Sequence, residues 1–211
     1  MTLIETEIRG AALVVREATT ADDLGDIRAE GCAAVLWRRD LKPGFQHWID
    51  ALDPAQLPRA RLVLRPQAVP GMLRNLCDVA GLEEGPERAW LEDDIADLAA
   101  RFADMMKAPY LRLRMDAVTT NGCSKFHVDA MLARLICTYR GTGTQSGVAT
   151  DGVEPSEVHQ APTGAPMILR GSLWRENPPS GLRHRSPPIA GTGETRLVLV
   201  LDPIYDIEDA D

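Results

Sequence analysis

The residues with the clearest chemical potential lie in the stretch KFHVD, where His127 and Asp129 are two positions apart. Residues two apart on a strand point to the same face and lie about 6–7 Å from each other. An imidazole and a carboxylate placed in this way could bind one metal ion. The pattern alone is weak evidence, because four histidines and 31 acidic residues in 211 positions give roughly 0.6 chance matches. A transition-metal site also needs a third ligand.

Two later histidines compete for that role. His159 lies in SEVHQAPTG, which is either a loop or the start of a strand, whereas His184 lies in GLRHRSPP, just before the last strand. Arg196 opens that strand, RLVLVLD, where a charge in such apolar company needs a partner. Because the turn IAGTG falls near the midpoint between them, His184 and Arg196 are predicted at the same end of two consecutive strands. His184 is therefore the better candidate, and His47 is expected at the surface or in packing.

The order of these residues resembles the Fe(II)/2-oxoglutarate-dependent dioxygenases over about residues 109–202. In that superfamily, H-x-D is followed by a distal histidine and then by a basic residue, as in His127, Asp129, His184 and Arg196. The resemblance implies that the first three bind Fe(II) and leave three coordination positions for 2-oxoglutarate and dioxygen. It implies that Arg196 binds the far carboxylate of 2-oxoglutarate as a forked partner. The implied activity is that of a hydroxylase-type oxygenase.

One feature departs from the superfamily pattern. Val198 stands where a serine or similar residue often follows the arginine, so the carboxylate of 2-oxoglutarate would need a hydroxyl from elsewhere. Tyr139, on the strand after H-x-D, is either that donor or a core tyrosine bonded to backbone.

The segments CSKFHVD, TYRGTGT, LRGSLW and HRSPP resemble, more narrowly, a bacterial family described only as a domain of unknown function. That family brings no established substrate, and its association with zinc homeostasis implies an alternative. The same three ligands could form a non-catalytic module that binds zinc or iron for metal homeostasis, with Cys123 or water as a fourth ligand. A third hypothesis is a metal-free jelly-roll scaffold.

The hydrophobic pattern changes at Pro109 and predicts an α+β fold. After it, Leu111, Leu113 and Met115 alternate with polar residues, and whether Arg112 and Arg114 point inward stays open. KFHVD, ARLICTYR, APMILRG, LRHRSPP and ETRLVLVLD follow as predicted strands. Residues 109–211 are expected to form a double-stranded β-helix (jelly-roll, cupin-like), and the glycine-rich stretch 140–165 a mobile lid.

The region 1–108 is predicted to be a helical α/β region that covers the barrel, as part of one integrated domain. A helix after Pro86 carries an apolar stripe that needs a partner, formed by Leu91, Ile95, Leu98, Phe102 and Met105. Further helices are predicted through GFQHWIDAL and over about 69–81, and strands at CAAVLWRR and RARLVLRP.

Composition excludes several classes of function. The net charge of −8 disfavours binding to a nucleic-acid duplex. No apolar run could span a membrane, and the start MTLIETEIRG lacks a secretory signal, so a cytoplasmic protein is expected. The four cysteines, which form no C-x-x-C pair, are expected to be reduced. The substrate, a small molecule or a protein, is not indicated by the sequence.

Overall fold

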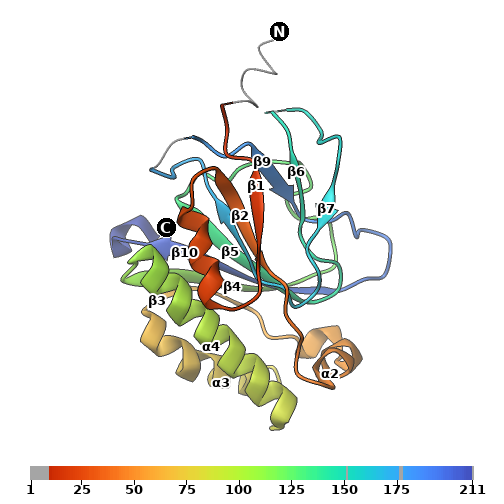
Figure 1. Cartoon of the computed structure of the whole chain (residues 1–211). Coiled ribbons are helices and arrows are strands. Elements are labelled where there is room, and N and C mark those ends of the chain that lie inside the picture. The colour runs from red at the N-terminus through yellow and green to blue at the C-terminus, as the bar shows by residue number, and fades with distance from the viewer. Residues whose placement is uncertain (1–9, 151, 176–177, 211) are drawn as a thin grey trace.

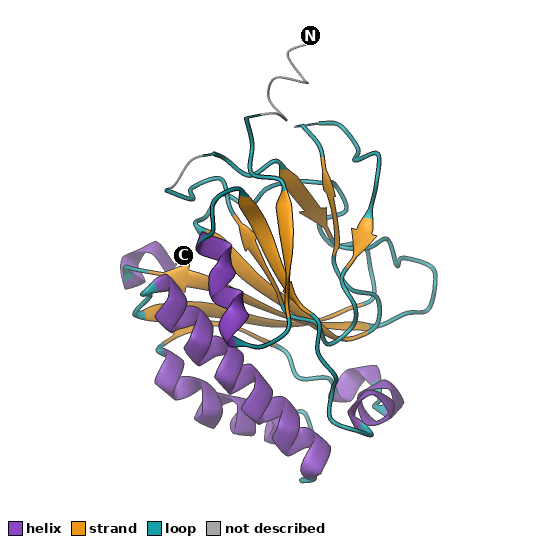
Figure 2. Cartoon of the chain, viewed as in Figure 1, coloured by secondary structure: helices purple, strands orange, loops and turns teal. Residues whose placement is uncertain are grey.

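The protein is described here by a computed structural model covering residues 10–150, 152–175 and 178–210. It is an α+β structure in which the main helices lie on one side of a large sheet (Figure 1). Figure 2 shows a smaller sheet on the opposite side. No helix among the described residues is long and apolar enough to cross a membrane. Most of the stretch MTLIETEIRG, in which no secretory signal is found, lies outside the described residues.

The large sheet has seven strands, of which only β1 and β2 pair in parallel. In spatial order they are β1 (Val14–Ala18), β2 (Cys32–Trp37), β8 (Met167–Arg170), β5 (Ala133–Arg140), β10 (Arg196–Ile204), β4 (Tyr110–Val118) and β3 (Ala60–Leu64). Three of these strands precede residue 109, so the sheet is built from both regions distinguished in the sequence.

The small sheet consists of β7 (His159–Gln160), β6 (Gln145–Val148) and β9 (Leu182–Arg185). Two of its strands lie in the stretch 140–165, so this stretch is not irregular throughout, and its role as a lid stays a prediction. Strands of four and two residues are too short to show alternation. The glycines that indicated a loop instead permit close backbone packing, since a Cβ at Gly147 would overlap the Glu157 carbonyl.

The helices are α2 (Phe45–Ala51), α3 (Val69–Val79) and α4 (Pro86–Met106), and short 3₁₀ segments are η1 (Asp22–Arg28), η2 (Pro54–Gln56), η3 (Pro66–Ala68) and η4 (Ile207–Ala210). Four of the five residues of the stripe predicted for α4, Leu91, Ile95, Leu98 and Phe102, are buried in one core with the leucines of β10. The fifth, Met105, is half-buried and packs against this core. The helix begins at Pro86, which suits a first-turn position because proline has no N–H to leave unpaired.

Strand β10 separates two cores by alternation. Leu197, Leu199 and Leu201 belong to the core shared with the helices, whereas Val198 and Val200 belong to the core on the side of the small sheet. Arg196 and Asp202 share the second face by the same alternation. On β4, the register places Arg112 and Arg114 opposite Asp202 and Val200, on that second face. The open question about their direction is thereby answered, and the candidate site lies on this face.

Candidate metal centre

A single backbone bridge brings two of the predicted ligands together. His127 and His184 form an isolated antiparallel bridge, in which each N–H donates to the carbonyl of the other at 3.1 and 3.0 Å. Their ring centroids are 4.6 Å apart. The predicted strand KFHVD is wrong beyond this bridge, because the chain turns at once: the Asp129 carbonyl accepts from the N–H groups of Met131 and Ser172. Asp129 is therefore positioned by a turn.

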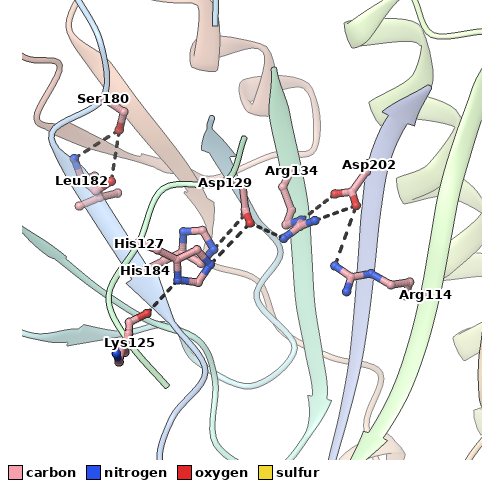
Figure 3. A network of polar contacts seen from close by, with 9 residues as sticks. All are labelled: Arg114, Lys125, His127, Asp129, Arg134, Ser180, Leu182, His184 and Asp202. Carbon is pink, nitrogen blue, oxygen red and sulfur yellow. Dashed lines mark hydrogen bonds and ion pairs between the residues drawn. The ribbon is translucent and has the colours of Figure 1, made fainter. Parts of the chain in front are cut away.

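The three ligand groups converge as the sequence predicted. One ligand atom from each of His127, Asp129 and His184 lies within 4.8 Å of the other two (Figure 3). Asp129 Oδ2 is 3.1 Å from His184 Nε2, and Asp129 Oδ1 is 3.5 Å from His127 Nε2. His127 Nδ1 lies 2.8 Å from the Lys125 carbonyl, which orients the ring and leaves Nε2 facing the carboxylate.

Arg134, which the sequence analysis missed, holds the carboxylate of Asp129, and Asp202, missed as well, holds Arg134. Arg134 on β5 donates to Asp129 Oδ1 at 2.7 Å and makes two further bonds to Asp202, at 2.6 and 2.8 Å. Figure 3 shows the resulting row from Asp129 through Arg134 and Asp202 to Arg114. The sequence feature that could have predicted this contact is Asp202, because an acidic residue at the end of an apolar strand requires a buried cation as its partner.

The carboxylate of Asp129 is ionised, and one of its two oxygens accepts no hydrogen bond among the described residues. Burial raises its pKa, but the interaction with His184 and the positive charges of Arg134 and His127 outweigh burial and lower the pKa to about 2. Oδ2 is buried and has no hydrogen-bond donor among the described residues, in spite of its short approach to His184. A buried anionic oxygen beside two imidazole nitrogens is a set of donor atoms that fits a divalent transition metal.

Arg196 lies in the same cavity as the two histidines. This cavity has a volume of about 210 Å³, and its lining includes Ile136, Thr144 and Val198 as well. Arg196 is only 2% exposed, and burial lowers its pKa, an effect partly offset by Glu194. Its Nε donates to the Thr142 carbonyl at 2.6 Å, and its Nη2 donates to Thr138 Oγ1 at 3.2 Å. These two bonds fix the plane of the guanidinium.

The structure does not bring Tyr139 to this cavity. Tyr139 lies on the helix-facing side of β5, where its hydroxyl donates to Asp94 Oδ2 of α4 at 2.6 Å. Burial and the charge of Asp94 raise its pKa well above the usual value. It is a core tyrosine, although it is bonded to a side chain and not to backbone. The hydroxyl next to Arg196 comes from Thr138, which the register places opposite Val198.

The remaining candidate ligands lie apart from the three converging groups. His159 is exposed on β7, 4.0 Å from Glu157, and His47 is exposed on α2. Cys123 lines the cavity but is exposed and is not among the converging ligand atoms. The other three cysteines are buried and free.

Comparisons with known proteins place the chain among oxygenase-like folds. The profile of a family described as "Protein of unknown function (DUF1826)" matches residues 18–202. No functionally curated protein matches the sequence. The structure of JOX2 in complex with 2OG, Fe and JA is similar with a TM-score of 0.50 and 13% identity, over 94% of this chain and 78% of that chain. The rice dioxygenase for auxin oxidation has a TM-score of 0.49 and 13% identity, over 93% and 84%. A 2OG-Fe(II) oxygenase family protein from Burkholderia pseudomallei has a TM-score of 0.47 and 16% identity, over 93% and 96%.

Proposed function

From the site itself we propose that the chain, which belongs to the family described as "Protein of unknown function (DUF1826)", is an Fe(II)- and 2-oxoglutarate-dependent oxygenase of the hydroxylase type. The observation that carries the proposal is the buried Oδ2 of Asp129, which has no hydrogen-bond donor among the described residues and lies beside two imidazoles that line a cavity together with the buried Arg196. The overall fold, which is similar to that of JOX2, supports it. In this proposal the two sheets form a double-stranded β-helix, and the helices of residues 1–108 cover it.

His127, Asp129 and His184 would hold the iron, because two imidazoles and one carboxylate leave three positions open. When bound, iron with 2-oxoglutarate supplies dioxygen activation coupled to oxidative decarboxylation of the 2-oxo acid to succinate and CO₂. Arg134 restrains Asp129 Oδ1, whereas Oδ2 has no hydrogen-bond donor among the described residues and would bind the ion. The two oxygens of the Asp129 carboxylate would thus have separate roles, Oδ2 in binding and Oδ1 in orientation.

Arg196 would bind the distal carboxylate of 2-oxoglutarate. A guanidinium has five N–H donors, and only two of those of Arg196 are bonded within the described residues. The remaining donors suit a forked contact with a carboxylate, and burial strengthens such a contact. Ile136, Val198 and Val200 give the cavity apolar walls that exclude water from the reacting groups.

Anaerobic titration of the Fe(II)-loaded protein with 2-oxoglutarate tests the proposal through the visible charge-transfer band of the chelate. We expect binding in the wild type and at least about tenfold weaker binding in Arg196→Gln, a loss of about 1.4 kcal/mol. Arg140→Gln is the matched control, because Arg140 lies on the neighbouring strand but donates to the Ile49 and Leu52 carbonyls. Metal binding without any 2-oxoglutarate binding would reject the oxygenase and would fit a metal-binding module instead.

A further inference from the structure

Guanidinium groups gather at the candidate site although the chain is acidic overall. The net charge is −8, yet Arg114, Arg134, Arg185 and Arg196 all line the cavity beside His127. Partly buried cations require anionic or hydrogen-bonding partners, because desolvation without compensation is costly. The partners of each arginine therefore show which of them is available to a ligand.

Three of the four arginines have partners. Arg134 is bonded to Asp129 and Asp202. Arg185 donates to Gln145 Oε1 at 2.9 Å and to Glu154 Oε2 at 3.4 Å, and it stacks 4.3 Å from the centroid of the Phe126 ring. Arg196 has its two hydrogen bonds and, under the proposed function, the co-substrate.

Arg114 is the exception. Its Nε is buried and has no hydrogen-bond partner among the described residues. Its nearest acid is Asp202, whose Oδ2 is 3.9 Å away, too far for a hydrogen bond, and both oxygens of Asp202 already accept from Arg134. Burial and the charge of Arg134 lower the pKa of Arg114, with Asp202 and Asp116 offsetting only part of this. Nε itself is enclosed, but the side chain as a whole is 22% exposed, so a ligand in the cavity can reach the terminal nitrogens, which make no hydrogen bond among the described residues.

We propose that the substrate carries an oxyanionic group, a carboxylate or a phosphate ester, which Arg114 binds beside the metal centre. The two terminal nitrogens of a guanidinium form a fork that matches two oxygens of such a group. The anion would supply acceptors for these nitrogens, since Asp202, 3.9 Å away, is too far to accept a hydrogen bond from them. Its position in the cavity shared with His127 and His184 places the rest of a small molecule next to the metal ligands. That the bound anion is a substrate rests on the proposed function, whereas the binding of an anion by Arg114 does not.

The test is an NMR titration of the full-length protein without added metal, observing the Nε–H resonance of Arg114. The probes are benzoate, phenyl phosphate and the neutral isostere benzamide. We expect at least one of the two anions to shift this resonance, with an apparent affinity at least tenfold tighter than that of benzamide. Benzoate and phenyl phosphate separate a carboxylate preference from a phosphate preference. Arg114→Gln should weaken binding of that anion at least tenfold.

A control variant separates a specific contact from the general positive charge of the protein. Arg61, opposite Arg114 on β3, lies outside the cavity lining, so Arg61→Gln should change the affinity by less than twofold. An equal loss in Arg61→Gln, no loss in Arg114→Gln, an equal response to benzamide, or no shift with either anion would overturn the inference. The wild-type resonance keeps the test valid if Arg114→Gln fails to fold. If the iron-loaded protein does not bind 2-oxoglutarate, the proposed oxygenase function is rejected, but the binding of an anion by Arg114 is not.

Discussion

Replacing Arg134 by leucine should destabilise the protein far more than most losses of an ion pair. Arg134 makes three charge-assisted hydrogen bonds, of 2.6 to 2.8 Å, to Asp129 and Asp202. The side chains of Arg134 and Asp202 are only 14% and 3% exposed, so water cannot replace the lost partner. Removing one member of a buried pair leaves an uncompensated charge and costs about 3–5 kcal/mol. The other cation near Asp202, Arg114, is 3.9 Å away and compensates little.

Urea unfolding of the metal-free protein measures this cost, and an exposed arginine provides the control. Arg101 also contacts two carboxylates, those of Asp97 and Asp22 at 2.7 and 2.6 Å, but its side chain is 38% exposed. Arg101→Leu should therefore lower the free energy of unfolding by about 1 kcal/mol or less. The double variant Arg134→Leu/Asp202→Leu should regain part of the loss of Arg134→Leu, because it removes the stranded anion.

The same substitution should weaken metal binding, because Asp129 Oδ1 loses the hydrogen bond from Arg134 that orients the carboxylate. Loss of a residue that orients a ligand typically lowers metal affinity 10- to 100-fold. Competition titration with a chromogenic chelator measures it. An Arg134→Leu protein that is no less stable than Arg101→Leu and binds metal as the wild type does would refute the reasoning.

Three further outcomes follow from the packing. Tyr139→Phe should lower the free energy of unfolding by about 1.5–3 kcal/mol, since the bond to the Asp94 carboxylate is lost, and should leave 2-oxoglutarate affinity unchanged; weaker binding would contradict the placement of Tyr139. Phe102→Ala, on the buried face of α4, should lower the free energy of unfolding in urea by about 3–5 kcal/mol. Gly171→Ala would push a Cβ onto the Met131 carbonyl oxygen, beside the turn that carries Asp129, and should reduce metal affinity, whereas Gly25→Ala, which meets open space, should not.

Local patterns sufficed for much of the fold. The stripe of α4, the alternation of β4 and the apolar run of β10 each lie within one element, where the period of the side chains is set by local backbone geometry. The approach of His184 to His127 and Asp129 was also predicted, because His184 and Arg196 flank a short turn. The short strands β6 and β7 were missed, since their pairing depends on partners elsewhere in the chain.

The sequence by itself determined which residues are candidate metal ligands, because imidazole and carboxylate chemistry belongs to the residue type and the order H-x-D…H…R can be read directly. Only the tertiary structure decided how they meet. The bridge between His127 and His184, the pairing of Arg134 with Asp202, and the exclusion of Tyr139 from the cavity all join residues far apart in the chain. Such contacts are selected by the burial of charge and of apolar surface in the folded sheet, and no local spacing encodes them.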